Sequence, residues 1–80
     1  MEKQKYIKTK QGEIIIFPCE LEHSDFKYFC PVSAGFCYIR ENIVDCFGES
    51  ISLNLKSDMK EDSIQATKQI HGIDAMLKLL

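Results

Sequence analysis

The sequence predicts an α+β fold, in which a small curled antiparallel sheet of four to five strands is followed by a C-terminal helix. Residues 5–17 form two short apolar runs around Gln11-Gly12, which is typical of a β-hairpin. Residues 32–47 form two more such runs, rich in Phe, Tyr, Ile and Val. After residue 57 the apolar residues recur at steps of three and four, which indicates a helix.

The first hairpin is expected to join residues 5–10 to residues 13–17. A two-residue loop would require a positive φ at Gln11, whereas the three-residue loop Lys10-Gln11-Gly12 requires it only at Gly12. We therefore favour the three-residue loop. Its register divides the side chains between two faces, with Ile7, Ile15 and Phe17 on one and Tyr6, Lys8, Ile14 and Ile16 on the other. Both faces of the second strand are then apolar, so we expect both to be covered.

The segment between the two hairpins has neither the period of a helix nor that of a strand. Pro18 has no N–H to donate and is expected to end the pairing of the first hairpin. Ser24 is a candidate N-cap for one helical turn over residues 25–29. Pro31 disfavours the helical region at Cys30, so we expect Cys30 to be extended and to lead into the next strand.

The second hairpin is expected to turn at Glu41-Asn42. A two-residue turn there sets apolar residues opposite one another, which supports this register. The expected pairs are Ile39 with Val44, Cys37 with Cys46, and Phe36 with Phe47.

A bent strand is expected to follow the second hairpin. Gly35 and Gly48 would lie roughly opposite each other, and a glycine inside a strand marks a bulge or a bend, which we assign to Gly48. Residues 50–56 then alternate between polar and apolar side chains. This period of two predicts a strand with one buried face, formed by Ile51, Leu53 and Leu55.

The C-terminal helix is expected from Met59 to His71. Asp58 and Glu61 have the spacing of a capping box and bring acidic charge to the helix N-terminus. Gly72 either ends this helix as a C-cap or weakens a continuous one, and we favour a C-cap with a second, looser turn from Ile73. The apolar residues that share one face are Ala66, Ile70, Ile73, Leu77 and Leu80.

Length and charge exclude several classes of protein. The 80 residues make a single domain, 1–80, with no room for a second. The net charge of −2 gives no overall attraction to nucleic acid or to anionic lipid. The first residues are charged, unlike a signal peptide, and no apolar run reaches the roughly 20 residues of a membrane span. We therefore expect a cytoplasmic protein without a membrane segment.

The four cysteines are potential zinc ligands together with His23. Only Cys19 and His23 approach the spacing of a zinc knuckle, and no second knuckle follows at Cys30. Cys37 and Cys46 have apolar neighbours typical of a core strand, and the cytosol favours free thiols. We therefore expect no metal and no other cofactor, with zinc binding kept as an alternative.

An enzyme is not expected. Cys19, His23 and Asp25 are the residue types of a thiolate–imidazole–carboxylate set. Groups so close in sequence rarely reach catalytic geometry, and the acidic neighbours of Cys19 disfavour a thiolate. The sequence also lacks a phosphate-binding glycine loop and a nucleophile elbow at Ser50.

Lysines cluster around Tyr6 near the N-terminus, which is a weak indication of nucleic-acid binding. They are Lys3, Lys5, Lys8 and Lys10. Lysines also protect an exposed edge strand from aggregation, and we favour that interpretation. The middle of the chain is acidic and disfavours phosphate, with Glu20, Glu22, Asp25, Glu41, Asp45 and Glu49. Nucleic-acid binding is therefore an alternative function only.

The apolar C-terminal segment, residues 73–80, is the most unusual surface feature. It carries more apolar side chains than one helical face can bury under a small sheet. We expect it partly to pack across the sheet and partly to contact another protein. The predicted interaction surface consists of Ile73, Met76, Leu77 and Leu80. We expect these side chains to contact the same residues of a second copy across the two-fold axis of a homodimer.

The pattern SAGFC…CFGESISLNLKS resembles short uncharacterised bacterial or phage-type proteins. The resemblance covers mainly residues 12–58 and implies no activity or site. We therefore predict a small non-enzymatic protein-interaction module of phage or mobile-element type. The alternative is a zinc- or nucleic-acid-binding accessory domain.

Overall fold

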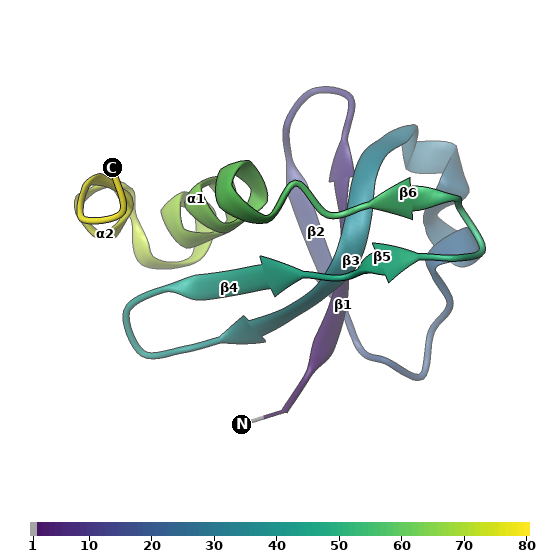
Figure 1. Cartoon of the computed structure of the whole chain (residues 1–80), viewed down its shortest axis with the longest axis horizontal. Helices are drawn as coiled ribbons and strands as arrows, with labels where there is room; N and C mark the ends of the chain where they lie inside the picture. Colours follow the sequence, from purple (N-terminus) through teal and green to yellow (C-terminus); the bar gives the residue numbers. More distant parts are fainter. Residues whose placement is uncertain (1) are drawn as a thin grey trace.

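The computed structural model describes residues 2–80 and confirms the α+β fold. Its main sheet is antiparallel with the strand order β2-β1-β3-β4. The strands are β1 (Gln4–Thr9), β2 (Ile14–Phe17), β3 (Pro31–Ile39) and β4 (Val44–Phe47). A second sheet pairs β5 (Glu49–Ser50) with β6 (Leu55–Lys56), and the helices are η1 (His23–Phe29), α1 (Met59–His71) and α2 (Ile73–Leu77). Figure 1 shows α1 and α2 towards one end of the molecule, and η1, β5 and β6 towards the other.

The first hairpin has the predicted three-residue loop. The Thr9 N–H donates to the Glu13 carbonyl at 2.8 Å, which leaves Lys10-Gln11-Gly12 as the loop, and Gly12 has a φ of 93°. Lys8 pairs with Ile14 and Lys5 with Phe17, as the predicted register requires. Both faces of β2 are covered, which confirms that prediction.

The second hairpin also has the predicted register. Ile39 pairs with Val44, Cys37 with Cys46, and Phe36 with Phe47. Gly48 has a φ of 80°, so the chain bends there as expected. A Cβ atom on Gly35 would lie 2.3 Å from the Phe47 carbonyl oxygen, because the two strands approach closely beside the bend.

The predicted single strand over residues 50–56 is wrong. Residues 51–54 form a turn that joins β5 to β6, and Ile51 is 90% exposed at its tip. The Ser50 hydroxyl accepts the Leu53 N–H at 3.2 Å, and Asn54 adopts a left-handed φ of 55°. Serine and asparagine stabilise turns in these two ways, and here they override the alternating pattern.

The connection from β2 to β3 differs from the prediction at two points. The N-cap of η1 is Glu22, whose N–H donates to the Asp25 side chain at 3.0 Å, and Ser24 lies inside the helix. Cys30 is left-handed, with a φ of 54°, rather than extended. Its N–H donates to the Lys27 carbonyl at 3.2 Å, which ends the helix immediately before Pro31.

The apolar core lies on both faces of the main sheet. The face towards α1 buries Tyr6, Ile14, Cys37, Val44, Cys46 and Ala66. The opposite face buries Ile7, Phe17 and Ala34, and partly buried side chains such as Phe26 of η1 and Leu55 of β6 cover them. Strands β1, β2 and β3 therefore contribute side chains to both clusters, whereas β4 contributes only to the cluster that faces α1.

Helix α1 has the predicted bounds but a different buried face. Its buried residues are Asp62, Ala66 and Thr67, whereas Ile70 of the predicted apolar face is 48% exposed. Asp58 is the N-cap without a side-chain bond, so the predicted capping box does not form there. The buried face of α1 is largely polar because its side chains attach the helix to the sheet by hydrogen bonds.

These hydrogen bonds tie α1 to both edge strands of the main sheet. The Val44 and Cys46 N–H groups of β4 donate to the hydroxyls of Thr67 at 2.9 Å and Ser63 at 2.8 Å. At the other edge the Gln69 amide accepts the Ile14 N–H at 2.8 Å and donates to the Ile14 carbonyl at 3.0 Å. The sheet is therefore curled so that a single helix bridges its two edges, which also shields them from pairing with other chains.

Candidate functional site

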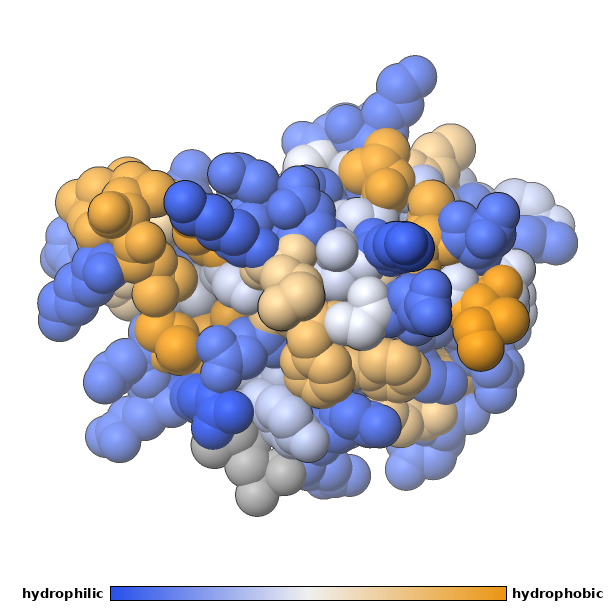
Figure 2. Space-filling view, viewed as in Figure 1, coloured by the Kyte–Doolittle hydropathy of each residue, from blue (hydrophilic) through white to orange (hydrophobic). Residues whose placement is uncertain are grey.

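The residues of the predicted interaction surface lie on α2 and, for Leu80, just after it. Helix α2 packs against α1. Four aliphatic side chains remain exposed, and we call them the C-terminal apolar surface: Ile70 at 48%, Ile73 at 56%, Leu77 at 56% and Leu80 at 75%. Met76, which was also predicted to contribute, is only partly exposed. Figure 2 shows apolar side chains gathered over the α2 end of the molecule.

A second candidate surface consists of three aromatic rings on the β3–β4 hairpin. Phe36 and Tyr38 alternate along β3, and Phe47 lies opposite Phe36 on β4. They lie on the face opposite to α1, because Cys37 and Cys46 point towards that helix. The Phe36 and Phe47 ring centroids are 6.2 Å apart, and those of Tyr38 and Phe47 are 5.4 Å apart. We call these three half-buried side chains the aromatic strip.

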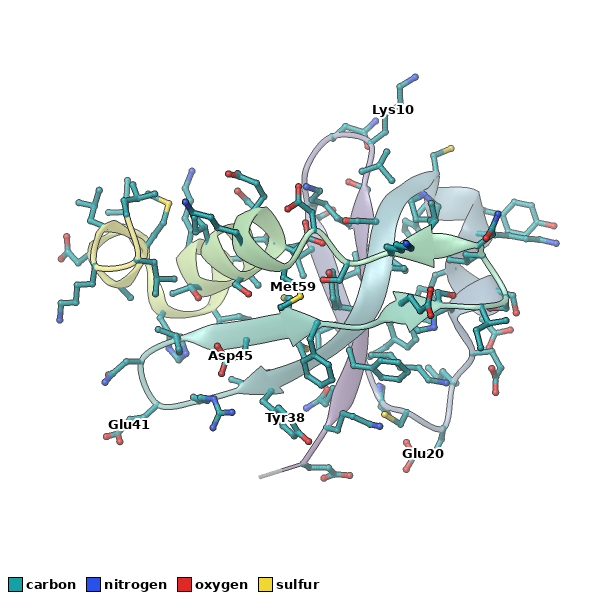
Figure 3. The ribbon with its side chains drawn as sticks, in the orientation of Figure 1. Lys10, Glu20, Tyr38, Glu41, Asp45 and Met59 are labelled. Atoms are coloured by element: carbon teal, nitrogen blue, oxygen red, sulfur yellow. The ribbon has the colours of Figure 1, made fainter. Side chains whose placement is uncertain are left out.

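Cationic side chains lie over two of the three rings. Lys3 Nζ is 4.6 Å from the Phe36 ring centroid, and the Arg40 guanidinium is 5.5 Å from that of Tyr38. Arg40 also forms an ion pair with Asp45, its neighbour on β4. Figure 3 shows Tyr38 and Asp45 on the hairpin, with Met59 of α1 across from them. Such contacts show that the rings bind cationic groups of this chain.

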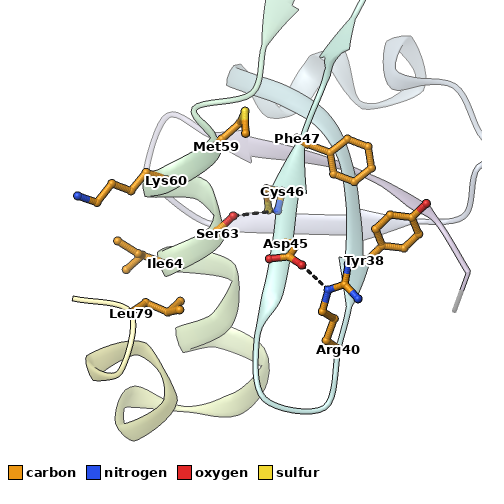
Figure 4. Close-up of a pocket in the computed structure, with 10 residues that line it drawn as sticks. All are labelled: Tyr38, Arg40, Asp45, Cys46, Phe47, Met59, Lys60, Ser63, Ile64 and Leu79. Carbon is orange, nitrogen blue, oxygen red and sulfur yellow. Dashed lines mark hydrogen bonds and ion pairs between the residues drawn. The ribbon is translucent and has the colours of Figure 1, made fainter.

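A groove lies on each side of Phe47. The first, of about 620 Å³, is bounded by Phe47 and Tyr38 on the hairpin and by Met59, Ile64 and Leu79 on the helical side (Figure 4). The second, of about 680 Å³, lies between Phe47 and the turn that carries Ile51. The N–H groups of Val44 and Cys46, on the free edge of β4 beside the first groove, are already bound by Thr67 and Ser63. A ligand here would therefore be recognised by side chains and not by addition of a strand.

The largest polar cluster is buried and centres on Asp62, which is fully inaccessible. Its Oδ2 accepts hydrogen bonds from the Tyr6 hydroxyl, from Ser33 Oγ at 2.7 Å and from the Asp58 N–H at 3.1 Å. Burial, together with the hydrogen bond to Asp62, raises the pKa of Tyr6 above its ordinary range. Because Asp62 has no exposed surface, we interpret this cluster as the joint between α1 and the sheet rather than as a binding site.

The interpretation of the N-terminal lysines as edge-strand protection is wrong, because β1 lies inside the sheet between β2 and β3. Lys8 Nζ lies 2.9 Å from Asp62 Oδ1 and balances its buried charge. Lys5 donates to the Leu21 carbonyl at 2.8 Å. Together with Lys3 on the aromatic strip, these lysines have specific contacts within the chain.

The residues considered as zinc ligands do not come together. Within residues 2–80 the structure contains no group of three or more His, Cys, Asp or Glu side chains suited to a metal ion. Cys37 and Cys46 are buried, as expected for core residues, and burial raises the pKa of Cys37 to about 11 and that of Cys46 to about 12. Such thiols have little thiolate at neutral pH, so they are poor nucleophiles.

The set considered for nucleophilic catalysis does not form either. His23 is buried between the rings of Phe17 and Phe36, and its Nε2 lies 2.8 Å from the Gly35 carbonyl oxygen. Cys19 instead donates to the Lys3 carbonyl at 3.3 Å, and Asp25 caps η1. His23 therefore links η1 to β3 and does not activate Cys19.

The aromatic strip was not identified from the sequence, although a signal for it existed. The predicted register already paired Phe36 with Phe47, and the period of two along the strand puts Tyr38 on the same face as Phe36. The strand pattern alone does not show whether a second layer covers that face. In the structure these three rings are only half covered.

Comparisons with protein-family models, with curated proteins and with solved structures found no match. In the part of the chain that the structure describes, no helix is long and apolar enough to cross a membrane. Function must therefore be inferred from the side chains of this chain alone.

Proposed function

We propose that this protein is a small non-enzymatic interaction module that pairs with a second copy of itself. The observation that carries this proposal is the C-terminal apolar surface, in which four aliphatic side chains are each about half exposed or more. Burial of an Ile or Leu side chain contributes about 1.5–3 kcal/mol. Contact between two copies of this surface would therefore supply several kcal/mol to a domain whose stability is expected to be small.

The way in which α1 is anchored supports this proposal. The helix faces the sheet with Asp62, Ala66 and Thr67, so Ile70 projects away from the core. Ile73 and Leu77 are four positions apart and therefore share one face of α2, and the exposed Ile70 and Leu80 flank this helix in the sequence. In a two-fold dimer the same patch serves both copies, so a single apolar surface is sufficient.

The test is the oligomeric state of the full chain by sedimentation velocity and light scattering, from low to high micromolar concentration. We expect a dimer whose melting temperature rises with protein concentration, because dissociation is coupled to unfolding. Leu77→Asp should abolish the dimer and the concentration dependence. The matched control is Ile51→Asp, which places the same charge at an exposed apolar residue outside this surface. A parent protein that remains monomeric at high micromolar concentration would contradict the proposal.

A further inference from the structure

The aromatic strip has the geometry of a platform for unpaired bases. Antiparallel sheets bind single-stranded nucleic acid by stacking bases on two or three aromatic rings of one face. The centroid separations of 6.2 Å and 5.4 Å within the strip exceed the 3.4 Å between stacked bases of a duplex. A ligand that places one base on each ring must therefore be unstacked, as single strands are.

The charges around the aromatic strip complement a phosphate backbone locally, although the chain as a whole is acidic. Lys3 and Arg40 lie over the outer rings, and Lys60 borders the first groove. Within residues 2–80, neither Lys3 nor Lys60 has a carboxylate within ion-pair distance. Arginine and lysine that lie over an aromatic ring can move outward to phosphate when a base takes their place.

Three acidic side chains near the aromatic strip have a cationic neighbour. Asp45 is paired with Arg40, and Glu22 lies 3.8 Å from Lys5. Glu49 lies opposite Lys56 in the register of β5 and β6. The local balance therefore leaves Lys3 and Lys60 free to attract an anion, one on each side of Phe47.

From this arrangement we infer that the aromatic strip is a binding site for single-stranded nucleic acid. Bases stack on Phe36, Phe47 and Tyr38, while Lys3 and Lys60 contact phosphates. The ring of Phe47 is the central contact, because no cation of the described chain lies over it and a groove opens on each side. The site shares no residue with the C-terminal apolar surface, so it stands or fails independently of dimer formation.

The test is fluorescence anisotropy of the full chain with labelled oligo(dT) and oligo(U), and with a mixed-sequence duplex, in a series of salt concentrations. We expect binding of the single strands that weakens as salt rises, and weaker binding of the duplex. The two oligonucleotides distinguish DNA from RNA as the preferred ligand. Failure of the parent to bind either one at low salt would overturn the inference.

Variants locate the site. Phe47→Ala should weaken binding about tenfold, because stacking of one base on an aromatic ring is lost. Phe47→Leu keeps an apolar side chain of similar size and should weaken binding by a similar factor. Circular dichroism of both variants checks that the fold is retained, so that weaker binding can be attributed to loss of the ring. The matched control is Tyr28→Ala, which removes an exposed ring that also lies beneath a lysine, Lys27, but on η1. Equal binding by the Phe47 and Tyr28 variants would overturn the inference.

Charge variants and a competing class of ligand complete the test. Lys60→Gln should weaken binding a few-fold and lower the salt dependence by about one released ion. Lys68→Gln is the charge-matched control and should leave binding unchanged, because Lys68 is an exposed lysine of the same helix that does not border the first groove. Chemical-shift changes of Phe36, Tyr38 and Phe47 with a proline-rich peptide but with neither oligonucleotide would assign the surface to a protein ligand instead, and would overturn the inference.

Discussion

The two faces of the main sheet are covered by helices that are attached in different ways. On one face η1 attaches through aromatic contact, with the Phe26 ring stacked on Phe17 at a centroid distance of 4.0 Å. On the other face α1 attaches through polar groups, with Asp62 and Thr67 fully buried and with hydroxyl and amide bonds to both edge strands. The first attachment depends on apolar area, and the second depends on the direction of hydrogen bonds.

This difference explains why so much apolar surface remains outside. A helix that packs by an apolar stripe buries its Ile and Leu side chains against its own sheet. Helix α1 instead contacts its sheet through the hydrogen bonds of Ser63, Thr67 and Gln69. Ile70 and the exposed side chains of α2 therefore remain available for another contact. The polar attachment of α1 and the exposed C-terminal apolar surface are therefore two consequences of one arrangement.

The largest effect is expected at the apolar attachment. Phe17→Ala removes a buried ring that contacts both Phe26 and His23. We expect a loss of about 4 kcal/mol in the free energy of unfolding, measured by urea denaturation, because a large buried side chain is replaced by a cavity. Phe29→Ala is the control, since Phe29 is 51% exposed and its loss should change stability much less. Equal losses in the two variants would show that η1 is not held by Phe17.

A somewhat smaller effect is expected at the polar attachment. Asp62→Ala leaves the Tyr6 hydroxyl, Ser33 Oγ and the Asp58 N–H without their common acceptor. We expect a loss of about 3 kcal/mol, less than for Phe17 because Lys8 is partly exposed and can be solvated by water. Glu61→Ala, at the adjacent exposed carboxylate, should change stability by less than about 0.5 kcal/mol. A stable Asp62→Ala variant would mean that α1 is attached by apolar contacts after all.

The β-hairpins could be predicted from the sequence because their determinants are local. Gly12 selects the loop of the first hairpin, and pairing of apolar residues selects the register of the second. The bounds of α1 also follow from local signals, since Gly72 ends it with a φ of 97°. In each of these cases the residues that decide the structure lie within a few positions of one another.

The attachment of α1 could not be predicted because its partners are distant in sequence. Gln69 binds the backbone of Ile14, and Asp62 binds Tyr6. In a helical pattern these side chains are typical of a solvent-exposed face, so the pattern assigns the apolar face to the core. The turn at residues 51–54 was missed for the opposite reason, because a strict apolar alternation outweighed the local turn signals of Ser50 and Asn54.

The smallest effect is expected at the far end of α1, where Gln69 holds the edge strand β2. Gln69→Ala removes two hydrogen bonds to the backbone of Ile14, at 2.8 Å and 3.0 Å. Because Gln69 is exposed, water can replace its amide, so we expect a loss of only about 1 kcal/mol. Lys68→Ala, at an exposed neighbour on the same turn, serves as the control.

Hydrogen exchange gives a sharper measure of this last variant than global stability does. The Ile14 amide should exchange several-fold faster in Gln69→Ala, because its acceptor is gone and the edge of β2 opens to water. The exchange rate of the Ile7 amide, in the interior strand β1, should change only as much as the global stability changes. If the two amides change by the same factor, the amide of Gln69 does not anchor β2, and the helix is attached to the sheet at β4 and Asp62 alone. If only the exchange rate of the Ile14 amide changes, α1 is hydrogen-bonded to both edges of the sheet through side chains that a helical pattern assigns to solvent.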